Sequence, residues 1–342
     1  MKKLFILAAA IVAFASCSQN EPEATVVPTR EIQFATAAQT RADMTEVNVD
    51  YLQKNGFVVY GYAASDAIFT KTEVLYAGDN ALATTATWAP KTAGDVKYWA
   101  SGVNYVFSAY APKGAAIDYS FTAENVKKIN SYTNDGVTDL VVSDKHNAFQ
   151  LTTKGEGDAA TATPVGLNFN HMLSRVKFSF ENAFADTDVK INITGVKIVG
   201  VGAIGSATFD GTTDKPVWAI STFGNFDYDQ IAQLNATDKK LVETVYRTII
   251  PAKAAYKVEF TIEAVADGKT FATIAYIGDN AVALPETEFV AGKSYDFKAF
   301  INVDKVGKVY PIEFNVTVTG WDDTTPETVI PGFGDPNATQ GN

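Results

Sequence analysis

Cysteine is almost missing from this sequence, and Cys17 is the single thiol among 342 residues. Histidine occurs only twice. A lone cysteine cannot form a disulfide within its own chain, and a zinc site needs three or four ligands, usually clustered. The composition therefore excludes a disulfide framework, and we expect neither a metal ion nor a cofactor.

Sequence patterns for catalysis are equally scarce. His146 lies two residues from Asp144, but no nucleophile motif typical of a hydrolase accompanies it. His171 precedes a strand-like run, and we interpret it as a hydrogen-bonded structural residue. We therefore expect that the protein is not an enzyme. Glycosidase carboxylates have no fixed spacing in a sequence, so that activity stays open.

Two further motifs receive a structural interpretation. The run GVGAIG at 200–205 has the spacing of a dinucleotide-binding loop, but the residues after it, SATFDGTTDKPVW, predict strand and turn instead of a helix. We therefore expect glycines at a bend or bulge. Asp135 and Asp139 in TNDGVTDL lie among too few acidic residues for a calcium loop, so we predict a turn there.

Positive charge is also in short supply. The chain has 28 Lys and Arg against 39 Asp and Glu, which gives a formal net charge of −11. An acidic surface repels phosphate groups, so nucleic acid is excluded as a partner. Apolar residues, in contrast, make up 46% of the chain and aromatic residues 12%, which is ample material for hydrophobic cores.

The N-terminus has the pattern of an export signal. Lys2 and Lys3 precede an unbroken apolar run from Leu4 to Phe14. The run is shorter than the roughly 20 residues that a membrane-spanning helix needs, so we interpret it as the apolar region of a cleaved signal. The order Phe-Ala-Ser-Cys ending at Cys17 resembles the lipobox of bacterial lipoproteins, in which this cysteine is acylated. The alternative is an ordinary secreted protein with a cysteine near the cut.

Strand patterns dominate the rest of the chain. Apolar and polar residues alternate in VNYVFSAYAP at 103–112, and two alternating runs flank Asp267-Gly268, which predicts a hairpin. Only TAENVKKINSY at 122–132 looks helical. The short strands and frequent turns predict an all-β fold of the sandwich type.

The length exceeds what one hydrophobic core normally covers, so we expect two domains. The stretch TKGEGDAATATPVG is the longest run of loop-forming residues in the middle of the chain, and it places the boundary near residue 166.

Several stretches together resemble the fimbrillin family, the pilin subunits of type V pili. The resemblance spans nearly the whole chain and rests on the lipobox at Cys17 and on QTRADMTE at 39–46, YVFSAYAP at 105–112, TDLVVSD at 138–144, LNFNHMLSRVKFSF at 167–180, RTIIPA at 247–252, FVAGKSYDFKAFI at 289–301 and VTVTGWDD at 316–323. It implies an outer-membrane lipoprotein with two tandem transthyretin-like β-sandwich domains, found at the cell surface and in the fimbrium.

The resemblance also implies a division of the chain. The expected units are a lipoprotein signal peptide at 1–17, a tether with a removable strand at 18–41, an N-terminal β-sandwich at 42–166, a C-terminal β-sandwich at 167–325 and a tail at 326–342. The lipid, palmitate among the expected chains, would be attached to Cys17.

In the fimbrillin family an arginine-specific protease removes the N-terminal segment. The matching bond here joins Arg41 to Ala42, and Arg30 is the second candidate. The run REIQFAT alternates Ile32 and Phe34 with polar residues, which predicts a short strand able to pair with a sheet edge. The alternative is a plain linker that is never cut.

Removing a strand would leave an unpaired edge and an apolar groove, which a strand of another subunit could fill to give a head-to-tail polymer. The tail after Trp321 carries Pro326, Pro331 and Pro336 and predicts a poor donor strand. The position in a pilus, whether shaft, tip or anchor, therefore stays open. So does a monomeric surface lipoprotein that binds glycans or host proteins through aromatic side chains, for which Trp88, Trp99 and Trp218 are the candidates.

Overall fold

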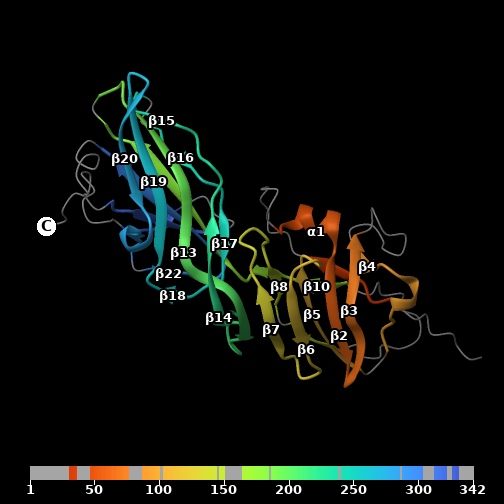
Figure 1. Ribbon diagram of the computed structural model, residues 1–342. Helices are drawn as coiled ribbons and strands as arrows, with labels where there is room; N and C mark the ends of the chain where they lie inside the picture. Colours follow the sequence, from red (N-terminus) through yellow and green to blue (C-terminus); the bar gives the residue numbers. More distant parts are fainter. Residues whose placement is uncertain are drawn as a thin grey trace, which may run out of the picture.

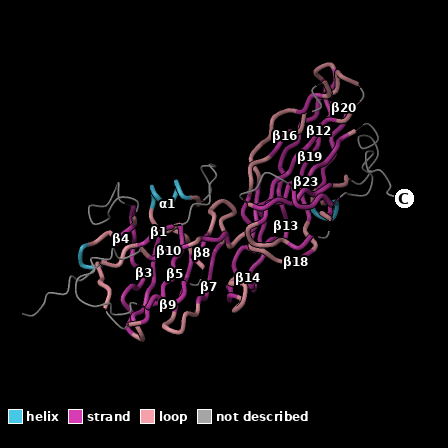
Figure 2. Tube along the Cα trace, turned by 180° about the vertical axis from the view of Figure 1, so that it is seen from behind, coloured by secondary structure: helices cyan, strands magenta, loops and turns pink. Residues whose placement is uncertain are grey.

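The computed structural model describes residues 31–36, 47–76, 87–100, 103–144, 146–150, 164–184, 186–237, 240–285, 287–302, 312–321 and 326–330. Nearly all of these residues lie in strands or in the turns between them, and the strands form two lobes side by side (Figures 1 and 2). The predicted all-β fold is confirmed. Among the described residues no helix is long and apolar enough to cross a membrane.

The N-terminal lobe is built on one strongly curled sheet, here called the N-terminal sheet. Its strands follow the order β10 (Val165–Leu167), β1 (Phe34–Thr36), β4 (Trp88–Pro90), β3 (Asp66–Tyr76), β2 (Phe57–Ala63), β5 (Asn104–Ala111), β8 (Val141–Ser143) and β11 (Phe169–His171), with β9 (His146–Gln150) beside β5. The alternation predicted at 103–112 is confirmed, because β5 places Tyr105 and Phe107 in one core and Tyr110 in another.

A second sheet, the connecting sheet, passes from one lobe to the other. Its order is β20 (Lys269–Tyr276), β19 (Lys257–Ala266), β13 (Lys190–Phe209), β7 (Lys127–Thr133) and β6 (Ile117–Phe121), and β14 (Pro216–Asp227), β15 (Leu234–Asn235) and β21 (Val282–Ala283) pair at its sides. The first part of β13 pairs with β19 and its last part with β7, so one strand joins both lobes (Figure 1).

The C-terminal lobe is a sandwich of the connecting sheet and a third sheet, the C-terminal sheet. This sheet has the order β16 (Val242–Glu243), β12 (Ser174–Asn182), β23 (Lys293–Ile301), β24 (Asn315–Gly320) and β25 (Pro326–Ile330), with β17 (Arg247–Ile249) beside β12, and a separate pair is formed by β18 (Lys253–Ala254) and β22 (Thr287–Glu288). Buried side chains such as Phe178, Phe260 and Phe297 fill the space between the two sheets. The transthyretin-like topology of each lobe stays a prediction.

The turn and helix chemistry follows from a few residues. Asp267 and Gly268 have φ values of 51° and 70° and close the predicted hairpin between β19 and β20. Helix α1 (Val49–Asn55) begins at Asn48, whose side chain accepts from the Tyr51 N–H at 2.8 Å, and ends at Gly56 with φ 74°. Short 3₁₀ turns lie at η1 (Ala93–Asp95) and η2 (Gly278–Asn280).

The helix expected at 122–132 is wrong. Asn125 has a left-handed φ of 59°, which stops a helix, and the residues after it form β7. In β7 the side chains of Ile129 and Tyr132 are buried against the N-terminal sheet, and this tertiary packing outweighs the local helix preference.

The domain limits differ from the expected ones in two places. Strands β10 and β11 both belong to the N-terminal sheet, so the chain leaves that lobe after His171 instead of at residue 166. Residues 326–330, expected to lie in a tail, form β25 at the edge of the C-terminal sheet. Pro326 is tolerated there because it is the first residue of the strand.

Candidate functional site: the seat of strand β1

Strand β1 is an interior strand of the N-terminal sheet although it is only three residues long. It runs parallel to β10, with Phe34 opposite Val165, and antiparallel to β4, with Phe34 opposite Trp88. The flanking backbone extends this pairing, since the Ile32 N–H donates to the Lys97 carbonyl at 2.8 Å and the Val165 N–H to the Gln33 carbonyl at 2.8 Å. The segment is therefore hydrogen-bonded on both sides.

The side chains of this segment alternate as the sequence predicts. Ile32 and Phe34 have no solvent exposure, whereas Glu31 is exposed and Gln33 is half-buried. Burying an Ile and a Phe contributes about 1.5–3 kcal/mol each. The Thr87 hydroxyl also donates to the Gln33 side-chain oxygen at 3.3 Å. The segment is thus held by both backbone and side-chain contacts.

The Phe34 ring lies among three other phenylalanine rings, which we call the aromatic socket. Its ring centroid is 5.7 Å from those of Phe69 and Phe107 and 6.1 Å from that of Phe57. The interplanar angles of 64° and 86° give edge-to-face contacts, which stabilise beyond area burial alone. In a flat sheet β1 and β5 would be about 19 Å apart, so these contacts require the sheet to curl back over itself.

Gly61 shapes the floor of this socket. A Cβ atom at this position of β2 would lie 2.7 Å from Cδ1 of Phe107 and 3.0 Å from Cδ2 of Phe69. The two rings can reach Phe34 because Gly61 has no side chain in their way. Together, the pairing edges of β4 and β10 and the rings of Phe57, Phe69 and Phe107 form what we call the β1 seat.

The link between β1 and the rest of the lobe is residues 37–46. Beyond it the chain is fixed again at Val47, whose N–H donates to Oδ2 of the buried Asp139 at 2.9 Å. The expected cleavage residues Arg41 and Ala42 fall in this link and lie outside the described residues, as do Cys17 and Arg30. A cut within 37–46 would leave β1 attached to its seat by non-covalent contacts alone.

A cluster of polar and aromatic side chains near Asp139 joins the two lobes. The His171 Nδ1 lies 3.0 Å from the Asp139 Oδ2, and the His171 ring stacks on Trp321. Arg175 donates to the Trp321 carbonyl oxygen at 2.6 Å, with its guanidinium carbon 4.4 Å from the centroid of the Tyr246 ring. The prediction of a hydrogen-bonded structural role for His171 is confirmed.

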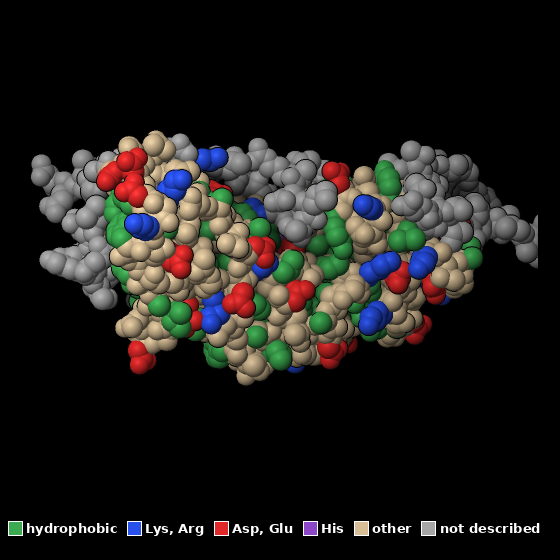
Figure 3. Space-filling model, turned by 45° about the horizontal axis from the view of Figure 1, so that its top comes forward, with side chains coloured by type: hydrophobic (Ala, Val, Ile, Leu, Met, Phe, Trp, Pro, Cys, Tyr) green, Lys and Arg blue, Asp and Glu red, His purple; other side chains and the backbone are tan. Residues whose placement is uncertain are grey.

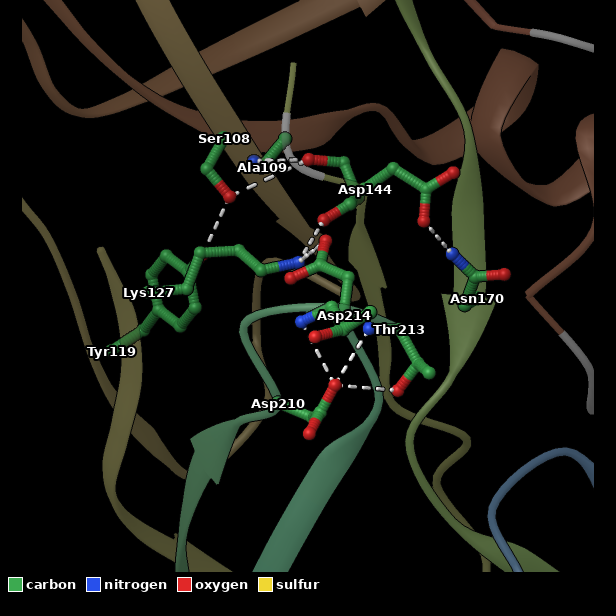
Figure 4. A network of polar contacts seen from close by, with 11 residues as sticks. Ser108, Ala109, Tyr119, Lys127, Asp144, Asn170, Asp210, Thr213 and Asp214 are labelled. Carbon is green, nitrogen blue, oxygen red and sulfur yellow. Dashed lines mark hydrogen bonds and ion pairs between the residues drawn. The ribbon is translucent and has the colours of Figure 1, made fainter. Parts of the chain in front are cut away.

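The buried Lys127 forms a further set of polar contacts at the junction of the two lobes (Figure 4). Lys127 Nζ lies 2.5 Å from Asp214 Oδ2 and donates to the Ser143 carbonyl at 2.7 Å, with the Phe209 ring 4.4 Å away. The Lys127 side chain is 1% exposed and the Asp214 side chain 14%. In the same network the Tyr119 hydroxyl is hydrogen-bonded to Ser108, and burial raises the pKa of that hydroxyl. These contacts fix β7 to both the N-terminal sheet and the β13–β14 loop.

The remaining candidate motifs have structural roles in the described part of the chain. The run at 200–205 lies within β13, where register shifts near Gly202 and Gly205 mark bulges, and the interpretation as bulge glycines is confirmed. Asp135 accepts from the N–H groups of Val137 and Thr138 and forms a turn, also as predicted. Among the described residues no group of three His, Cys, Asp or Glu side chains could hold a metal ion.

The three tryptophans proposed for ligand binding are mostly inside the protein. Trp88 is 3% exposed and Trp99 8%, and both belong to the core around β1. Trp218 is half-buried, and its indole N–H donates to the Met172 carbonyl at 3.0 Å. Trp88 and Trp99 therefore cannot present a ring face to a glycan in this conformation.

On the face shown in Figure 3, acidic and basic side chains are interspersed.

Sequence reasoning missed several residues of the site. Nothing local marks Gly61 as the floor of a socket, since its role depends on rings from β3 and β5. The alternation of β2, β3 and β5 could identify Phe57, Phe69 and Phe107 as core residues, but not as neighbours of Phe34. These contacts depend on how the sheet curls.

The fold defines a two-lobed all-β protein in which strand β1 closes the N-terminal core. The fimbrillin-like family matches residues 40–321, and the chain belongs to this family. No curated protein matches the chain.

Three solved structures of fimbrial proteins show similarity to this chain. A fimbrial protein from Bacteroides vulgatus is 17% identical with a TM-score of 0.61, and the match covers 85% of this chain and 99% of that chain. A fimbrial assembly protein from Parabacteroides distasonis is 12% identical with a TM-score of 0.45, covering 88% and 98%. The fimbrial anchor protein Mfa2 from Porphyromonas gingivalis is 10% identical with a TM-score of 0.36, covering 89% and 100%.

Proposed function

We propose that this protein is a structural and adhesive pilin subunit that is exported as an outer-membrane lipoprotein and assembled by strand exchange after cleavage at Arg41. The observation that carries the proposal is the burial of Ile32 and Phe34 in the β1 seat. A removable strand must be part of the sheet before the cut, and residues 31–36 have that property.

Cleavage changes how β1 is held. While the chain is intact, β1 is tethered near its seat at a high effective concentration and rebinds whenever it detaches. After a cut between Arg41 and Ala42, detachment becomes a dissociation into dilute solution, and the lipid on Cys17 would stay with the detached segment. A strand from another subunit can then compete for the seat.

Loss of β1 would leave a gap between β4 and β10. The N–H of Val165 and the carbonyl of Lys97 would lose their partners, and the rings of Phe57, Phe69 and Phe107 would be uncovered. Each unpaired backbone group in a buried position costs about 1–3 kcal/mol. An added strand restores these bonds and buries the rings, which drives association without a catalytic group.

The partners follow from this scheme. Other pilin subunits would supply and receive strands in a head-to-tail filament, and an arginine-specific protease would act on the link at 37–46. The lipid on Cys17 would hold the precursor at the outer membrane, and the assembled subunit would lie in the fimbrium, where a host surface ligand is a further partner.

The test is proteolysis of the purified precursor by an arginine-specific protease. We expect a new N-terminus at Ala42 and ladders of oligomers on a denaturing gel without boiling. The variant Arg41→Ala should remain uncut and monomeric, and Arg30→Ala serves as the matched control that should still be cut and assemble. A precursor cut at Ala42 that stays monomeric with β1 still seated contradicts strand exchange.

A further inference from the structure

The β1 seat sets different requirements for each residue of an incoming strand. At the position of Phe34 three phenylalanine rings surround the side chain edge-to-face, with Gly61 leaving room for two of them. At the position of Ile32 the side chain is fully buried and the backbone N–H donates to the Lys97 carbonyl at 2.8 Å. An incoming strand therefore needs an aromatic ring at the position of Phe34 and a backbone N–H at the position of Ile32.

The direction of the strand in the β1 seat is fixed as well. The pairing is parallel to β10, with Phe34, Ala35 and Thr36 opposite Val165, Gly166 and Leu167, and antiparallel to β4. A strand of the opposite direction would exchange the positions of its two buried residues. The ring would then meet the place of Ile32 instead of the socket.

We infer that the β1 seat selects, from another subunit, a strand with an aliphatic residue two positions before an aromatic one and a backbone N–H on the aliphatic residue, and that residues 328–334 of this chain are a poor occupant. This inference rests on the proposed function, because the seat must first be vacated. Its first part follows from the contacts of Ile32 and Phe34. Its second part follows from the sequence of this chain's own C-terminal segment.

Residues 328–334 in the C-terminal segment fit these requirements poorly in the two alignments that place Phe333 or Ile330 at the position of Phe34. With Phe333 at the position of Phe34, Pro331 takes the position of Ile32, and proline has no N–H for the Lys97 carbonyl. With Ile330 in the socket instead, the three rings lose their aromatic partner and Thr328 replaces Ile32. Residues 326–330 are in addition already paired with β24. Residues 328–334 are therefore a poor occupant of the β1 seat.

The experiment uses the full chain with a specific protease site placed across residues 38–44 and cut after folding, so that β1 remains in its seat. A fluorescent peptide of residues 30–36 is added, and its uptake is followed by fluorescence anisotropy. Competing peptides are the same sequence with Phe34→Ala, with Ile32→Pro or with Glu31→Ala, and the peptide of residues 328–334. The Glu31→Ala peptide is the matched control, because Glu31 is exposed.

We expect the parent and Glu31→Ala peptides to compete equally well. The Phe34→Ala peptide should compete about a hundred-fold to a few thousand-fold more weakly, since Phe-to-Ala changes in cores cost about 3–5 kcal/mol. The Ile32→Pro and 328–334 peptides should compete on the order of ten-fold more weakly or worse.

Equal competition by all peptides would overturn the inferred selectivity while leaving strand exchange intact. Strong competition by the 328–334 peptide would overturn the second part of the inference. If no peptide is taken up, the parent included, the seat does not open, and the proposed function fails together with the inference.

Discussion

The His171 ring stacks on the indole of Trp321 with centroids 4.5 Å apart and an angle of 5° between the planes. His171 belongs to β11 of the N-terminal sheet, and Trp321 directly follows β24 of the C-terminal sheet. Two residues 150 positions apart thus lie in one stack across the junction, and the Asp139 carboxylate contacts the Nδ1 atom of the imidazole.

Replacing Trp321 by Ala should destabilise the protein by about 3–5 kcal/mol, because a large buried ring is lost from the core between the lobes. Trp321→Phe keeps a ring for His171 to stack on and should cost clearly less. Urea unfolding followed by circular dichroism measures both variants. Equal losses for Ala and Phe would show that the stack adds nothing.

Phe34→Ala should lower the free energy of unfolding of the intact chain by about 3–5 kcal/mol, since the socket ring is fully buried. Phe271→Ala is the matched control, because Phe271 is 54% exposed on β20 and its loss should cost under about 0.5 kcal/mol. The two are compared by their urea midpoints. A Phe34→Ala loss as small as that of the control would remove the basis of the β1 seat.

Gly61→Ala should destabilise the N-terminal lobe by about 1–3 kcal/mol, because the new methyl group would press on Phe107 and Phe69. Gly114→Ala provides a comparison with the same chemical change, since nothing lies within 4 Å of a Cβ there. Thermal unfolding of both variants is the measurement. The socket description is wrong if the two melting temperatures agree.

Asp214→Ala should cost about 3–5 kcal/mol, because it leaves the buried Lys127 ammonium without its carboxylate. The double variant Lys127→Met with Asp214→Ala should recover most of this loss, since no buried charge remains. Lys91→Met tests an exposed pair with Glu73 and should change stability by less than about 1 kcal/mol. A double variant as unstable as Asp214→Ala alone would speak against a buried-charge penalty.

Asp135 should make the free energy of unfolding depend on pH in the acid range. Burial tends to raise the pKa of its carboxyl, but hydrogen bonds from the Thr138 hydroxyl and from the N–H groups of Thr138 and Val137 outweigh this and hold the pKa below the ordinary 3.8. The contribution is therefore complete above about pH 4 and is lost as the pH falls through the lowered pKa. In urea unfolding between about pH 2 and pH 6, the stability difference between the wild type and Asp135→Asn should narrow at the acid end. A difference independent of pH would contradict the lowered pKa.

Local patterns predict much of this fold. The alternation in β5 and the Asp267-Gly268 turn are confirmed because a half-buried strand and a tight turn each have a signature within a few residues. Helix α1 also has such a signature, in the Asn48 cap and the Gly56 stop, and sequence reasoning passed over it.

Other features have no local signature. The run at 122–132 has helical residue types but becomes β7, because burial of Ile129 and Tyr132 depends on a sheet that is distant in sequence. For the site, the alternation of Ile32 and Phe34 predicts a buried strand. The identity of the socket rings depends on how far the N-terminal sheet curls, which no short segment determines.

Strand β13 has a mechanical consequence. Its first part is bonded to β19 in one lobe and its last part to β7 in the other, with β14 alongside. A tensile load applied between the two lobes therefore acts along a continuous strand and strains the flanking backbone bonds in shear, many at once. We therefore expect the two lobes to resist separation under load better than two domains joined only by a loose linker would.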